Sequence, residues 1–69
     1  MRKKVKLIAK QISLAEVEFR REEFRETYYR IRLMRGDTEE AARVNAETLL
    51  QQSLVTGIVV EVVTEERFL

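Results

Sequence analysis

The stretch "LMRGDTEEAA", residues 33–42, joins two segments that both have the apolar period of a helix. Gly36 follows the last apolar residue of the first segment, and glycine readily adopts the left-handed conformation that ends a helix. Asp37 precedes the second segment, where its side chain would cap the first turn, with Glu40 as the reciprocal partner. The stretch therefore predicts the tight turn of a helical hairpin, and this structural role accounts for the Arg35-Gly36-Asp37 triplet better than adhesion-receptor recognition does.

The segment before the turn predicts a helix from about Leu14 to Met34. Ser13 followed by Glu16 three residues later is typical of a helix start. The expected core face contains Val17, Phe24, Tyr28 and Ile31. A second, broken apolar stripe, which includes Phe19, Tyr29 and Leu33, lies on the opposite side. This helix therefore needs two surfaces to pack against.

The segment after the turn predicts a helix from about Thr38 to Val55, and Gly57 is its expected stop signal. The residues that share its apolar face are Ala42, Ala46, Leu49, Leu50 and Ser53. Small alanine side chains would let this helix approach the first one closely.

The run "IVVEVVT", Ile58 to Thr64, is rich in β-branched residues and predicts a strand. A strand needs a partner for its backbone groups, and the alternating run "KKVKLIAK", residues 3–10, is the candidate within the chain. A helix through Val5, Ile8 and Ile12 is the alternative for that run. Pairing it with the last strand would bring lysines beside acidic residues, which favours the strand.

These elements give a single small α+β domain, residues 1–69, in the order β-α-α-β. A chain this short buries only about 60% of its unfolded surface, and a two-stranded sheet is marginal alone. We therefore expect a homodimer that completes a four-stranded sheet. The candidate contacts with the second copy or another protein partner are Phe19, Tyr29, Leu33, Val59, Val63 and Phe68.

The composition argues against catalysis. The chain has no cysteine and no histidine, and its two glycines are far apart, so thiolate, imidazole and phosphate-loop chemistry is missing. The adjacent carboxylates, such as Glu22 and Glu23, would point in different directions on a helix. We therefore expect no enzyme activity, no metal, no cofactor and no small-molecule substrate. The most apolar run is too short to span a membrane, and we expect a cytoplasmic protein.

The net charge of +1 conceals an uneven distribution. Residues 1–35 contain eleven cations and five acids, whereas residues 36–69 contain two cations and seven acids. A basic half can bind nucleic-acid phosphates, or it can simply pair with the acidic half. The candidate phosphate contacts are Arg2, Lys3, Lys4, Lys6 and Lys10.

A basic strand followed by a helix, a glycine turn and a second helix resembles the ribbon-helix-helix repressors over residues 3–55. The resemblance implies paired N-terminal strands in the DNA major groove, with Lys4, Lys6 and Ile8 as the outward positions. The long first helix and the added C-terminal strand depart from that family. The sequence thus favours a homodimeric interaction or regulatory module, with nucleic-acid binding as the alternative.

Overall fold

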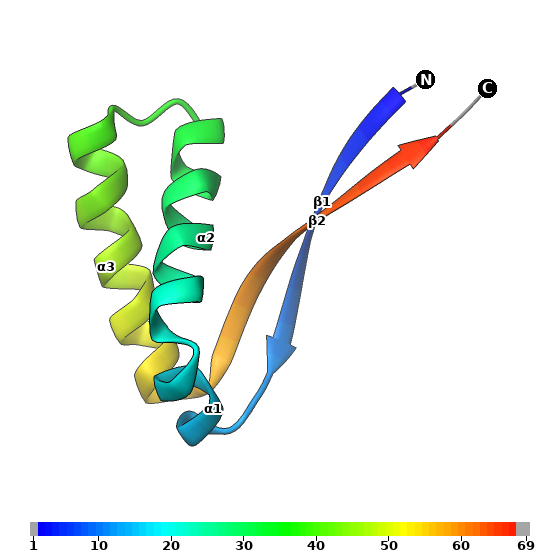
Figure 1. Cartoon of the computed structure of the whole chain (residues 1–69). Coiled ribbons are helices and arrows are strands. Elements are labelled where there is room, and N and C mark those ends of the chain that lie inside the picture. The colour runs from blue at the N-terminus through cyan, green and yellow to red at the C-terminus, as the bar shows by residue number, and fades with distance from the viewer. Residues whose placement is uncertain (1, 68–69) are drawn as a thin grey trace.

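The computed structural model describes the backbone of residues 2–67 and the side chains of residues 5–64. In chain order, its elements are strand β1 (Arg2–Gln11), helices α1 (Leu14–Phe19), α2 (Arg21–Met34) and α3 (Glu39–Thr56), and strand β2 (Ile58–Arg67). A helical hairpin lies beside a two-stranded ribbon, whose far end, with both chain termini, leads away from the helices (Figure 1). The α+β class and the strand assignment of the N-terminal run are confirmed.

The two strands pair antiparallel in a register that places Ile8 opposite Glu61. Lys3 and Lys4 are the register partners of Glu66 and Glu65. The expected proximity of basic and acidic residues is therefore present in the pairing. Among the described side chains, Lys10 forms an ion pair with Glu61 across the ribbon at 3.4 Å, so the contact between the two strands is partly electrostatic.

The first helix is divided at Arg20, so the prediction of one continuous helix is wrong at this residue. Arg20 has φ −100° and ψ 21°, although its amide still donates to the Glu16 carbonyl. Its guanidinium bonds Glu61 on β2 at 3.1 Å and lies 4.5 Å from the centre of the Phe24 ring. The break thus coincides with the point where a helix side chain binds the ribbon. Ser13 caps α1 as predicted, accepting from the Glu16 amide.

The turn between α2 and α3 has the predicted glycine but a different cap. Gly36 has φ +99°, and Gly57, which ends α3, has φ +71°. Thr38, not Asp37, is the N-cap of α3, because its hydroxyl accepts from the Ala41 amide at 3.2 Å. Asp37 instead binds Arg32, one turn back on α2. The helical hairpin is confirmed, with the cap moved by one residue.

The core lies where the helical hairpin meets β2. Its buried residues are Val17, Phe24, Tyr28, Ile31, Ala46, Leu50 and Val59. All four residues of the core face expected for the first helix belong to this core. The ion pairs Glu18–Arg21, Glu22–Arg25 and Glu26–Arg30 form on the outer surface.

The molecule is thin and extended for its length. It measures 41 × 28 × 15 Å, with a radius of gyration of 13.1 Å. A compact domain of this length would have a radius near 11 Å. The ribbon accounts for the difference, because its outer part leads away from the helices (Figure 1).

The two glycines should respond differently to substitution by alanine. Gly36→Ala should cost about 1 kcal/mol, the usual penalty of a left-handed alanine, because no atom lies within 4 Å of the added Cβ. Gly57→Ala should cost clearly more, because its Cβ would lie 2.6 Å from the Ile12 carbonyl oxygen. Urea unfolding of the two variants measures this difference, and equal losses would contradict the close approach at Gly57.

Candidate functional site

The outer edge of β1 is open. The Ile12 amide donates to the Gly57 carbonyl at 2.7 Å, which marks this pair as hydrogen-bonded. Because hydrogen-bonded and non-bonded pairs alternate in an antiparallel ladder, the amides of Lys6, Ile8 and Lys10 point toward β2. Those of Val5, Leu7 and Ala9 point outward. None of these three donates to another element within residues 2–67.

The outer edge of β2, in contrast, is partly covered. Its Ile58 amide donates to the Thr56 hydroxyl at 3.2 Å. The Val60 amide donates to the Tyr28 hydroxyl at 3.4 Å, so α2 lies against this edge. The helices therefore block β2 near its start, which leaves β1 as the accessible edge of the ribbon there.

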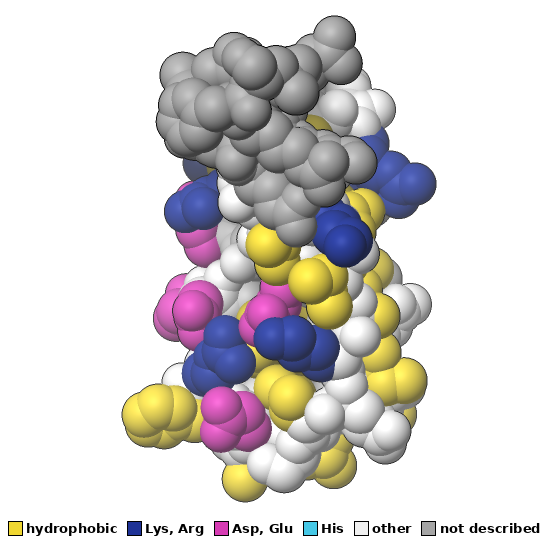
Figure 2. Space-filling model, turned by 90° about the vertical axis from the view of Figure 1, so that its right-hand side faces the viewer, with side chains coloured by type: hydrophobic (Ala, Val, Ile, Leu, Met, Phe, Trp, Pro, Cys, Tyr) yellow, Lys and Arg dark blue, Asp and Glu magenta, His cyan; other side chains and the backbone are white. Residues whose placement is uncertain are grey.

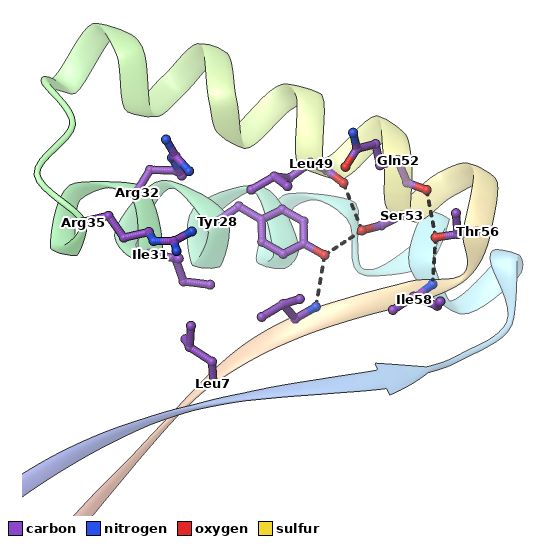
Figure 3. A pocket seen from close by; sticks show the side chains of 11 residues that line it. Leu7, Tyr28, Ile31, Arg32, Arg35, Leu49, Gln52, Ser53, Thr56 and Ile58 are labelled. Atoms are coloured by element: carbon purple, nitrogen blue, oxygen red, sulfur yellow. Dashed lines mark hydrogen bonds between the residues drawn. The ribbon is translucent and has the colours of Figure 1, made fainter.

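Beside the open edge lies an apolar cleft of about 490 Å³, between the helices and the ribbon. Leu7, Ile58 and Val60 line its ribbon wall, and Tyr28, Ile31 and Leu49 line its helix wall (Figure 3). Leu7 is 51% exposed, Val5 48% and Ile58 48%. These side chains share one face of the ribbon, named here the cleft face: Val5, Leu7 and Ala9 with Ile58, Val60 and Val62.

The Tyr28 hydroxyl joins the cleft walls. It lies 2.6 Å from the Ser53 Oγ of α3 and also accepts from β2. Ser53 in turn donates to the Leu49 carbonyl at 3.0 Å, so the Tyr28 hydroxyl donates to Ser53. This chain of bonds ties α2, α3 and β2 together and satisfies a buried phenol.

At the turn end of the cleft, Asp37 is held by two donors. The Arg32 guanidinium binds it at 2.8 and 3.3 Å, and the Asn45 amide binds it at 2.8 Å. The Arg32 hydrogen bond, then the Asn45 bond, hold the pKa of Asp37 below its ordinary value of 3.8. Arg35, beside them, lines the cleft and extends along it toward Tyr28 (Figure 3).

Among the described side chains of the ribbon, Lys6 and Lys10 lie on the face opposite the cleft face. Lys6 and Lys10 are exposed there, and Lys10 forms an ion pair of 3.4 Å with Glu61. The side chains of Arg2, Lys3 and Lys4 lie outside the described part. Seen from the ribbon side, apolar and basic side chains lie next to one another (Figure 2). Of the five candidate phosphate contacts, the described side chains are those of Lys6 and Lys10, and Glu61 neutralises Lys10.

The arginines of α2 are largely neutralised. Arg21, Arg25 and Arg30 of α2, and Arg20 at its N-cap, each pair with at least one glutamate. Arg43 of α3 lies over the Tyr29 ring, 4.9 Å from its centre. These contacts use the cations that an electrostatic nucleic-acid surface would need.

The predicted partner contacts that the structure describes differ widely in exposure. Phe19 is 89% exposed at the end of α1, whereas Val59 is fully buried in the core of its own chain. Tyr29, Leu33 and Val63 are half-buried, and Phe68 lies outside the described residues.

Val5, Leu7 and Ile58 form an exposed face that the sequence did not predict. Their alternation was visible and supported the strands, but it carries no information about which face the helices leave open.

Among the described residues, no group of three His, Cys, Asp or Glu side chains could hold a metal ion. None of the described helices has the length and apolar character required to cross a membrane. Comparison with protein-family models, curated proteins and solved structures gives no match to this chain. The site is therefore defined by the geometry of the open edge and the cleft.

Replacing Tyr28 by phenylalanine should destabilise the fold by about 1–3 kcal/mol, because the buried Val60 amide and Ser53 hydroxyl each lose a partner. Tyr29→Phe is the matched control, since the Tyr29 hydroxyl makes no hydrogen bond within the described chain and should be nearly neutral. Chemical denaturation of both variants measures the difference. Equal free energies of unfolding would show that the Tyr28 hydroxyl does not join the walls.

Stability should fall in acid. The pKa of Asp37 is lowered by Arg32, that of Glu23 by Arg20 and that of Glu47 by Arg25. A carboxyl whose folded pKa lies below its unfolded value stabilises the fold above the unfolded pKa, and this stability is lost as pH falls through the folded pKa. We expect the free energy of unfolding to decline below about pH 4.

The acid loss should be smaller in Asp37→Asn, which removes one of these groups and also lowers stability at neutral pH. Denaturant melts of both proteins between about pH 7 and pH 2.5 provide the test. An identical pH dependence in the two proteins would contradict the ionic role of Asp37.

Proposed function

We propose that this chain is a non-catalytic protein-interaction module that works as a homodimer, with the two copies joined through the open edge of β1. The observation that carries the proposal is the outward-pointing row of Val5, Leu7 and Ala9 amides beside half-exposed apolar side chains. An edge of this kind pairs readily with another strand, because every new backbone bond satisfies a donor and an acceptor.

The shape of the molecule supports self-association. A slab 15 Å thick with a radius of gyration above that of a compact domain buries little apolar area. The chain has no cysteine for a disulfide staple, so a second copy is the remaining means of burying the cleft face. The lack of cysteine also suits a reducing compartment, which supports a cytoplasmic location.

Nucleic-acid binding has weaker support. The arginines of α2 have glutamate partners, and Lys10 has Glu61. Among the described cations of β1, Lys6 alone has no ion pair. A phosphate-binding surface draws its affinity from several free cations acting together. Nucleic-acid binding is therefore the alternative function, and retention on DNA distinguishes it from dimerisation.

The dimer should be sensitive to charge at the open edge. We expect the parent chain to have twice the monomer mass in light scattering at tens of micromolar, on the order expected for a modest interface. Leu7→Lys should shift it to a monomer, because a lysine in the middle of the open edge discourages strand pairing. Val44→Lys is the matched control: Val44 is 66% exposed on α3, away from the ribbon, and its replacement should leave the dimer intact.

A parent chain that stays monomeric at these concentrations would contradict the proposal. So would a Val44→Lys variant that dissociates as completely as Leu7→Lys. Retention on mixed-sequence DNA that survives Leu7→Lys and is lost on Lys6→Glu would favour the nucleic-acid function instead.

A further inference from the structure

We infer that the two copies pair their β1 strands antiparallel, about a two-fold axis that passes between the Leu7 residue of each copy. This inference rests on the proposed homodimer and specifies its geometry. It places Leu7 opposite the partner's Leu7, and Val5 opposite the partner's Ala9. Each such pair exchanges two backbone hydrogen bonds.

The alternation of β1 restricts the possible registers. Only odd-numbered residues direct their amides and carbonyls outward, so odd residues must face odd residues across the new pairing. A two-fold axis near the middle of the strand can then pass at Lys6, at Leu7 or at Ile8. Shifts to the ends of the strand would shorten the ladder and lose bonds.

Matching of apolar side chains favours the Leu7 axis. In this register the three apolar residues that β1 contributes to the cleft face all meet apolar residues, since Val5 meets Ala9 and Leu7 meets itself. An axis at Ile8 would place Val5 opposite Gln11. An axis at Lys6 would place two lysines directly opposite each other, which destabilises a strand pair.

The charges separate the Leu7 axis from the Ile8 axis. The Leu7 axis brings Lys4 opposite the partner's Lys10, and each of these has an acid on its own ribbon: Glu65 is the register partner of Lys4, and Glu61 binds Lys10 at 3.4 Å.

The Ile8 axis would instead bring Lys6 opposite the partner's Lys10. Lys6 has Val63 as its register partner and no ion pair among the described residues. In the Leu7 register, in contrast, each of the two facing lysines has an acidic residue on its own ribbon, either as register partner or in an ion pair.

The inferred register has a consequence for the cleft. A two-fold axis perpendicular to the sheet keeps the cleft faces of both copies on the same side. Leu7 lines the cleft and lies at the axis, so the clefts of the two copies would open toward each other over the central strands. The wall that a single copy lacks on its β1 side would then come from the partner, which completes an apolar groove between two helical hairpins.

Single cysteines test the register directly, because the chain contains none. Residues of a hydrogen-bonded pair have Cα atoms about 5.5 Å apart, which suits a disulfide. Mild oxidation should therefore link Leu7→Cys to itself. It should also link an equimolar mixture of Val5→Cys and Ala9→Cys, whereas each of these two variants alone should remain unlinked. Val44→Cys reports random collisions.

Other linkage patterns would overturn the register. Linkage between Leu7→Cys and Ala9→Cys identifies an axis at Ile8, and linkage between Val5→Cys and Leu7→Cys identifies an axis at Lys6, with the products separated by mass. A dimer in light scattering that links at none of these positions would refute β1 pairing while the homodimer stands. A monomer in light scattering would refute both.

Discussion

The hydrogen bond from the Ile12 amide to the Gly57 carbonyl, 2.7 Å long, determines the register of the entire ribbon. It joins the chain just before α1 to the chain just after α3. The left-handed Gly57 permits this approach, because a side chain there would meet the Ile12 carbonyl. Ladder alternation then decides which amides of β1 face β2 and which face outward. A contact at the helix end of the ribbon thus decides which amides of β1 lie on its open edge.

The helical hairpin is coupled to the ribbon by two polar contacts over an apolar core. The Tyr28 hydroxyl reaches Ser53 and the Val60 amide, and Arg20 reaches Glu61. Both contacts involve β2, so β1 depends on β2 for its position. This asymmetry explains why the amides of Val5, Leu7 and Ala9 have no partner in the described chain, whereas that of Val60 binds Tyr28.

Local patterns were sufficient to predict the elements and much of the core. The period of Val17, Phe24 and Tyr28 identified the buried face, and Gly57 identified the end of α3. The break at Arg20 was not predictable, because its partner Glu61 is forty-one residues away. Asp37 and Thr38 are both good capping residues, and Arg32 decided between them. Both faces of β2 are apolar, so alternation could not show that Val59 would be buried.

Pairing of the outer edge of β1 with a second copy is tested most directly by amide hydrogen exchange resolved by residue. The amides of Val5, Leu7 and Ala9 should exchange more slowly as protein concentration rises. Those of Ile8 and Lys10, which already face β2, should be protected throughout. Rapid exchange of the three outward amides at every concentration, with the two inward amides protected, would contradict the account.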